Sequence, residues 1–131
     1  MRTDYNTKIV SSSRELSTKE RIVLKDFNDC IGLDTVVDNE NGVILDPDVI
    51  VEVQVHNERA RDDKDYTTII ILDKNGTKYS TSSNSLRDSI SDIMDELKDL
   101  TDDEKSELKI KVFKKPSKNY QGKYFMTATV I

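Results

Sequence analysis

The clearest pattern of hydrophobic and polar residues in this chain lies near its middle. Between residues 49 and 55, four valines alternate with mostly polar neighbours, and this period of two predicts a β-strand whose valines face the core. The β-branched run at 67–72 predicts a second, more buried strand. An Asn-Gly pair at 75–76 predicts a tight turn with both residues at positive φ, after which 77–81 returns as a third strand. We therefore expect a three-stranded antiparallel meander.

The apolar spacing changes to a helical period on both sides of the meander. Residues 17–20 have the sequence of a capping box, and a helix is expected from there to a C-terminal cap at Gly32. A second amphipathic helix of about 14 residues is expected after the meander, with Ser85 and Asp88 in capping-box register and an apolar stripe from Leu86 to Leu97.

Three further strands are indicated by shorter patterns. Residues 43–45 predict a short strand before the meander, and alternation over 108–113 and 124–131 predicts a closing hairpin with a loop at 114–122. In the last strand, the side chains expected to point inward are Tyr124, Met126, Ala128 and Val130.

The order of these elements favours an α+β fold that is mostly β. A meander, a helix between the third and fourth strands, and a closing hairpin are typical of the five-stranded Greek-key barrel called the OB-fold. The N-terminal helix is an addition to that plan. We expect a flexible N-terminal arm at 1–14 and a single OB-like domain at 15–131.

Composition narrows the class of protein. Hydrophobic residues make up 35% and charged residues 34% of the 131 positions, which is compatible with a folded domain that has an ionic surface. No apolar run reaches the length of a membrane span. The single cysteine, Cys30, cannot form an internal disulfide, which fits a reducing cytoplasm.

The charges are distributed unevenly along the chain. Residues 87–107 hold nine acidic and three basic side chains, whereas 108–131 hold six lysines and no acidic residue. Because local fields decide which partners approach a face, an acidic protein with one basic hairpin is able to bind polyanions.

The sequence offers little support for catalysis. It has one histidine, His56, and lacks a Gly-rich phosphate loop, a Cys/His cluster and a nucleophile elbow. The acidic runs near residues 62–65 and 102–104 lack the spacing of a calcium loop, so we interpret them as surface charge. We expect no enzyme activity, cofactor or metal.

The outward face of the closing hairpin is more informative. Phe113 shares its side of the strand with two lysines, and Phe125 falls on the less apolar side of the next strand. Aromatic rings on a cationic surface are typical of platforms that stack unpaired bases. In an OB-fold the loops at 57–66 and 114–122 would flank the ligand groove. The predicted nucleic-acid-binding residues are Arg59, Arg61, Lys64, Tyr66, Lys109, Lys111, Phe113, Lys114, Lys115, Lys118, Tyr120, Lys123 and Phe125.

Several segments resemble single-stranded DNA-binding proteins of phages and mobile elements from Gram-positive bacteria. They are Leu16-Ser-Thr-Lys-Glu-Arg21, Val55-His-Asn-Glu58 with Lys64-Asp-Tyr66, Lys78-Tyr-Ser-Thr-Ser82, and the stretch from Lys114 to Phe125. The resemblance implies an OB-type fold and sequence-tolerant binding of single strands during replication or recombination. It also implies a cytoplasmic location in a bacterial host, and replication or recombination proteins as further partners.

A rival function uses the opposite charge. In a small acidic phage protein that inhibits a host enzyme by DNA mimicry, the acidic side of the helix at 85–99 would be the active surface. The lysine hairpin would then be incidental. Binding to single-stranded oligonucleotides distinguishes these two hypotheses.

Overall fold

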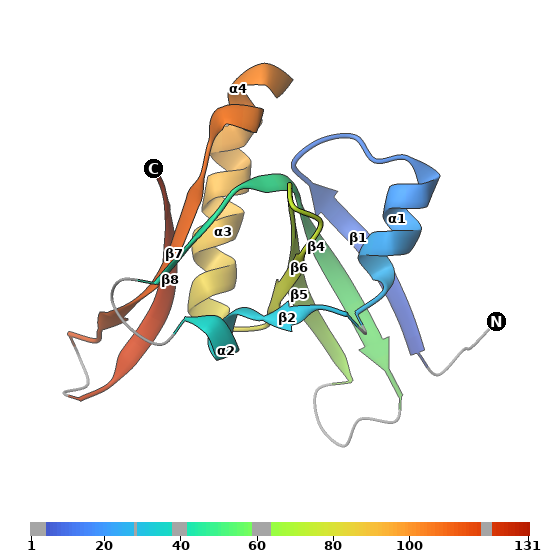
Figure 1. The fold of residues 1–131 in the computed structure, drawn as a ribbon. Coiled ribbons are helices and arrows are strands. Elements are labelled where there is room, and N and C mark those ends of the chain that lie inside the picture. Colours follow the sequence, from blue (N-terminus) through green and yellow to red (C-terminus); the bar gives the residue numbers. More distant parts are fainter. Residues whose placement is uncertain (1–4, 28, 38–41, 59–63, 119–121) are drawn as a thin grey trace.

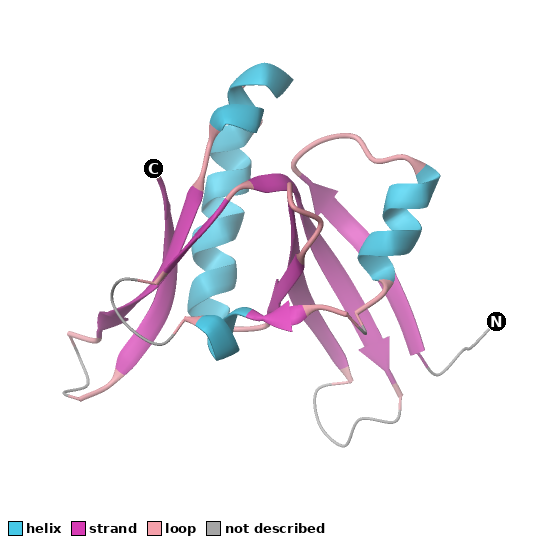
Figure 2. Ribbon diagram, in the orientation of Figure 1, coloured by secondary structure: helices cyan, strands magenta, loops and turns pink. Residues whose placement is uncertain are grey.

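The computed structural model describes residues 5–27, 29–37, 42–58, 64–118 and 122–131. These residues form eight strands and four helices, arranged as an α+β fold (Figures 1 and 2). The elements in chain order are β1 (Tyr5–Ser12), α1 (Thr18–Lys25), β2 (Ile31–Gly32), α2 (Leu33–Val36), β3 (Val43–Leu45), β4 (Pro47–Asn57), β5 (Asp65–Asp73), β6 (Lys78–Thr81), α3 (Asn84–Leu97), α4 (Asp102–Glu107), β7 (Ile110–Pro116) and β8 (Tyr124–Val130).

The strands form two sheets. The large sheet has the order β1-β4-β5-β6-β2, and the small sheet has the order β3-β7-β8. All pairs are antiparallel except β2 with β6. The predicted meander is confirmed as β4-β5-β6, and the closing hairpin as β7-β8. The predicted five-stranded barrel is not what the described strands form, because they make two separate sheets that do not close.

A corner at Asp46 carries the chain from the small sheet to the large one. β3 pairs with β7, whereas β4, which is separated from β3 by this single residue, pairs with β1 and β5. The backbone N–H of Asp46 donates to Oδ1 of Asp73 at 2.7 Å, and the N–H of Lys74 donates to the carbonyl of Asp46 at 2.9 Å. These bonds fix the corner against the β5–β6 turn.

One hydrophobic core fills the space between the two sheets and α3. Figure 1 shows α3 standing between the β7–β8 hairpin and the large sheet. The apolar stripe predicted for this helix supplies Leu86, Ile90 and Met94, which pack with residues from both sheets. The sheet residues in this core include Leu45, Ile50, Ile69, Ile71, Ile110, Val112 and Met126.

A second core lies on the opposite face of the large sheet. The β4 valines from Val49 to Val55 are at most 1% exposed and pack with Leu24 of α1 and Ile70 of β5. The sequence assigned these valines to the core of a barrel, but they lie under the N-terminal helix instead. Because these valines are almost completely buried, a charge introduced at one of them would have no route to water.

The N-terminal region differs most from expectation. The residues predicted to be a flexible arm contain β1, which pairs with β4 along most of its length. The capping box of Ser17 and Glu20 is confirmed, but α1 ends at Lys25 and does not reach Gly32. Gly32 has φ −67° and precedes α2, so it is not a left-handed cap.

Three local predictions are also corrected. Only Gly76 of the Asn-Gly pair has positive φ, at 91°, because its N–H bonds to the carbonyl of Asp73 in a longer turn than the one expected. α3 starts at Asn84, so Ser85 and Asp88 do not form its capping box. In β8, Tyr124 is 60% exposed and Val130 38% exposed, whereas Met126 is buried as predicted.

The residues after α3 hold one helix that the sequence analysis did not foresee. Thr101 and Glu104 form a capping box that starts α4, where only the end of α3 was expected. Within the described residues, no helix is both long and apolar enough to cross a membrane.

Candidate nucleic-acid interface

The outer face of the small sheet brings together most of the predicted hairpin residues. Cross-strand partners share a face, and the register pairs Phe113 with Thr127 and Lys115 with Phe125. Lys111 lies two residues before Phe113 and therefore on the same side. We call this surface the outer face, and its members are Ile44, Lys109, Lys111, Phe113, Lys115, Phe125 and Thr129. The hydroxyl of Thr127 is 2.9 Å from that of Ser89 in α3, so Thr127 lies where the sheet meets the helix.

Apolar groups on the outer face are accessible to a ligand. Ile44 is 60% exposed and Phe125 is 39% exposed, while Phe113 is half-buried. Ile44 joins this surface because β3 pairs with β7 in a register that sets it beside Lys111. Sequence reasoning missed Ile44, since the pairing of β3 with β7 leaves no local signal.

Two ammonium groups lie close to the Phe113 ring. The Nζ atoms of Lys111 and Lys115 are 5.1 Å and 6.0 Å from the ring centroid, within the range of cation–π attraction. Neither lysine forms an ion pair with a carboxylate in the described part of the chain. The ring is therefore bordered by cations that remain available to an anionic ligand.

The end of the hairpin adds a shallow hollow next to Phe125. It is lined by Lys115, Pro116, Ser117, Lys118 and Phe125. The N–H of Ser117 donates to the carbonyl of Lys123 at 2.9 Å, so the pairing of the two chain segments continues past the strands. Lys118 and Lys123 are both exposed.

Lys114 and Tyr124 lie on the other side of the hairpin. Lys114 is in β7, which extends to Pro116, and pairs with Met126 of the inner face. Tyr124 pairs with Pro116 and also alternates with Phe125. Lys114 is thus the one lysine of β7 that does not share the surface of Phe113 and Phe125.

The residues predicted around the β4–β5 connection belong to a different surface. Tyr66 pairs with Val55 and therefore lies on the α1 side of the large sheet, not beside the outer face. Lys64 forms an ion pair with Glu58 at 3.2 Å. Arg59, Arg61 and Tyr120 lie outside the described residues.

His56 is held between two carboxylates at the end of β4. Its Nδ1 is 2.6 Å from Oδ1 of Asp65, and its Nε2 is 2.6 Å from Oε1 of Glu58. Hydrogen bonds first with Asp65 and then with Glu58 raise the pKa of the imidazole, because they favour its protonated form. Among the described residues, no three His, Cys, Asp or Glu side chains are arranged to hold a metal ion.

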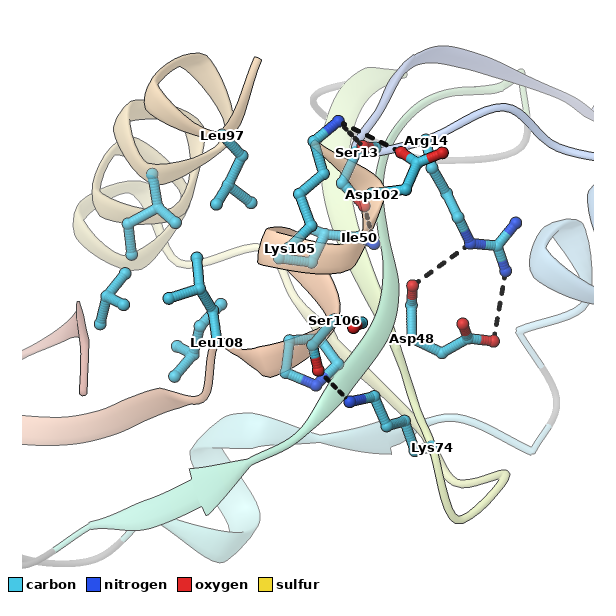
Figure 3. A pocket seen from close by; sticks show the side chains of 14 residues that line it. Ser13, Arg14, Asp48, Ile50, Lys74, Leu97, Asp102, Lys105, Ser106 and Leu108 are labelled. Carbon is cyan, nitrogen blue, oxygen red and sulfur yellow. Dashed lines mark hydrogen bonds and ion pairs between the residues drawn. The ribbon is translucent and has the colours of Figure 1, made fainter. Parts of the chain in front are cut away.

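The pocket in Figure 3 contains cations that are already bonded within the protein. Nζ of Lys105 donates to the carbonyl of Ser13 at 2.9 Å, and Arg14 contacts the carboxylate of Asp48 at 3.2 Å. Lys74 donates to the carbonyl of Ser106. This pocket joins α4 to the start of β4, and its charged groups are occupied in doing so.

Comparison with known proteins adds one finding. A family model described as "Phage Single-stranded DNA-binding protein", of the Phi29 type, matches residues 4–130. No curated protein matches, and no solved structure matches.

Proposed function

Because the chain belongs to the family of Phi29-type phage single-stranded DNA-binding proteins, we propose that it binds single-stranded DNA without sequence preference through the outer face of the small sheet. Phe113 and Phe125 stack on bases, and Lys109, Lys111 and Lys115 contact the phosphates. Lys118 and Lys123 extend the contacts around the end of the hairpin, and Lys114 reaches the backbone from its opposite side.

The observation that carries this proposal is the shared face of two aromatic rings and three unpaired lysines. Every base has a flat π surface, so stacking on a ring is tolerant of sequence. Duplex DNA keeps its bases stacked inside, so it offers only phosphates to the same lysines. The combination of rings and cations therefore favours unpaired strands.

We also propose that the fold is an elaborated OB plan. The bent pair β3–β4 takes the place of the first OB strand, followed by β5, β6, α3, β7 and β8 in the expected order. β1 and α1 are additions: β1 extends the large sheet at its edge, and α1 covers the valine face. On this plan residues 15–131 act as one binding domain.

The remaining predicted residues are proposed as secondary contacts. Arg59, Arg61 and Tyr120 belong to the two connections that flank the ligand groove of an OB-fold. Lys64 and Tyr66 would contact only a DNA strand that extends past the β4–β5 end of the large sheet. For Lys64 to bind a phosphate, its ion pair with Glu58 must first break.

The cellular role we propose is protection of single strands during phage or mobile-element replication or recombination, inside the bacterial host. Binding of this kind requires no catalytic group, and replication or recombination proteins are the expected partners. The alternative of an acidic inhibitor that mimics DNA finds no support in the family match.

The decisive experiment measures oligo(dT) binding by variants of the two rings. Phe125→Ala is the cleanest change because this ring is 39% exposed. Phe113→Leu removes the ring and keeps an apolar group, since Phe113 is half-buried. Each stacked base is worth about 1–3 kcal/mol, so we expect the affinity to fall about 5- to 150-fold.

Tyr124→Ala is the matched control, because it removes an exposed ring from the opposite face of the same strand. Its affinity for oligo(dT) should stay close to that of the parent. Weak duplex binding should be unchanged in all three variants. Normal melting with parent-like oligo(dT) affinity in the Phe113 and Phe125 variants would refute the stacking surface.

A further inference from the structure

Most cations of the described residues fall into two groups; Arg87, which donates hydrogen bonds to Thr67 and Asn84, belongs to neither. Six are ion-paired with carboxylates: Arg14, Lys64, Lys74, Lys78, Lys98 and Lys105. Those with neither an ion pair nor a hydrogen bond lie in only two regions of the described chain. The first region is the β7–β8 hairpin and the residue before it, with Lys109, Lys111, Lys114, Lys115, Lys118 and Lys123. The second region consists of β1 and α1, with Lys8, Lys19, Arg21 and Lys25.

Three of the four N-terminal cations border a single groove between β1 and α1. Its lining residues are Lys8, Ile9, Val10, Ser11, Ser12, Glu15, Leu16, Arg21 and Lys25. Among the described residues, this lining includes three basic residues and one acidic residue. Arg21 and Lys25 are four residues apart and so lie on the same side of α1. Lys8 lines the groove from the edge strand β1, where the register pairs it with Gln54 on the face of the sheet away from the β4 valines.

The strand side of the groove also offers hydrogen-bond donors. β1 is an edge strand that pairs only with β4, so its outward N–H groups have no strand partner among the described residues. The register shifts between Ile9 and Ser11, which leaves Val10 outside the ladder. The hydroxyl of Ser11 makes no hydrogen bond in the described part, whereas that of Ser12 donates to the carbonyl of Arg14.

We propose that this groove is a second phosphate-binding surface, which holds the sugar–phosphate backbone of the same DNA strand that stacks on the outer face. The inference rests on the proposed function, and it extends the binding site to the N-terminal elements. Unpaired lysine and arginine side chains, backbone N–H groups and a free hydroxyl are the groups that contact phosphates in protein–DNA complexes. None of the described residues that line the groove is aromatic. It therefore binds the backbone and contributes no base stacking.

The two surfaces lie at opposite ends of the molecule. Figure 1 shows α1 and the edge strand β1 at the right of the molecule and the β7–β8 hairpin at the left. A short oligonucleotide occupies only the stacking surface, whereas a long strand reaches both. Binding of long strands should consequently depend on the groove, and binding of short strands should not.

The test compares oligo(dT) of about 6 and about 30 nucleotides, since one OB-type site covers about 4–16 nucleotides. The groove variant is Lys8→Gln with Arg21→Gln and Lys25→Gln, all three of which are exposed and unpaired in the parent. With the long strand, its log–log salt slope should be smaller by about 2, because each phosphate contact on a single strand contributes about 0.7. With the short strand, its slope should equal that of the parent.

Two further variants serve as controls. Lys19→Gln removes an exposed, unpaired cation from α1 that does not line the groove, and it should leave both slopes unchanged. Glu15→Gln removes the single carboxylate of the groove lining and should raise the affinity for the long strand. A gain of affinity cannot arise from unfolding, so this variant separates the proposal from a loss of structure.

The proposal is overturned if the triple variant and Lys19→Gln have the same salt slope on the long strand. It is also overturned if the triple variant lowers the slope equally on both lengths, because the groove would then be part of the primary site. Failure of the proposed function would appear elsewhere, as unaltered short-strand binding by Phe125→Ala.

Discussion

At the scale of single residues, Lys78 shows how a buried charge organises the N-terminal elements. Its side chain is 4% exposed, and its Nζ donates to the carbonyls of Val23 and Asp26 at 2.8 Å and 2.7 Å. It also pairs with Asp29 at 2.6 Å. A cation at this point compensates the negative end of the helix dipole and joins the end of α1 to β6.

Removal of this ammonium should destabilise the protein. We expect Lys78→Met to lower the free energy of unfolding by about 2–4 kcal/mol, since hydrogen bonds to charged groups contribute about 1.5–3 kcal/mol each. Urea denaturation followed by circular dichroism measures this change. Lys98→Met removes an ion pair whose lysine is 70% exposed, and it should cost about 1 kcal/mol or less. Equal losses in the two variants would contradict the role given to Lys78.

His56 gives the protein a pH-dependent contact at the β4–β5 end. Its pKa is raised by the bonds with Asp65 and Glu58, so the folded state holds the proton more tightly than the unfolded state. The stabilisation is therefore complete below the ordinary pKa of about 6.5 and is lost as the pH rises through the raised value. NMR titration of His56 should give a pKa above 6.5, and His56→Gln should abolish the corresponding slope of stability against pH. A pKa at or below the ordinary value would refute these contacts.

The sequence contained enough information to find most of the candidate surface but not its limits. Alternation in two strands was sufficient to place Phe113 and Phe125 with the lysines. Ile44 reaches the same face only through the pairing of β3 with β7. Tyr66 was predicted to join the interface because it follows the 57–66 loop. Its cross-strand pairing with Val55 instead places it on the α1 side of the large sheet.

At the scale of elements, the junction before β3 depends on a glycine. Gly42 has φ 62°, and a Cβ atom placed on it would lie 2.0 Å from the carbonyl oxygen of Val112. Any side chain here would push β3 away from β7. The edge of the outer face would move with it, since Ile44 follows two residues later.

Gly42→Ala should destabilise the protein more than Gly76→Ala. Both positions have positive φ, which costs an L-residue about 1–2 kcal/mol, but a Cβ at Gly76 meets nothing within 4 Å. The difference between the two free energies of unfolding therefore reports the clash with β7. If the two variants unfold at the same denaturant concentration, β3 does not pack against β7 as described.

Elements with a strong local period were predictable, and those fixed by distant partners were not. The valine alternation of β4 and the stripe of α3 identify their elements directly. β1 has a mostly polar sequence and becomes a strand because β4 offers it an edge. The end of α1 is set by Lys78, which lies more than 50 residues later in the chain.

At the scale of the whole molecule, acidic and basic surfaces are separated. The exposed carboxylates of α3 and its C-terminal end include Asp92, Glu96 and Asp99, which line a groove with Ile93, Leu97, Leu100, Leu108 and Val130. The larger of the two groups of unpaired cations lies in the small sheet and its hairpin. This separation was visible in the sequence as a change of sign near residue 108.

The acidic surface should slow the approach of DNA. Replacing Asp92, Glu96 and Asp99 by their amides should increase the association rate with oligo(dT) several-fold at low salt, because it removes long-range repulsion of the phosphates. The gain should diminish above about 0.1 M salt, where the Debye length falls below about 10 Å. Stopped-flow fluorescence measures the association rates of the parent and the variant at low and at high salt. A gain that is independent of salt would exclude an electrostatic origin.

The strand pairing also determines the order in which the protein is able to fold. β1, β2 and β3 each pair with a strand that is synthesised much later, namely β4, β6 and β7. By contrast, β4-β5-β6 and β7-β8 are consecutive strands, and closing a short loop costs less entropy than closing a long one. The meander is therefore the first sheet able to form as the chain leaves the ribosome. β1 and β2 find their partners in the meander, whereas β3 remains without a partner until β7 has been synthesised.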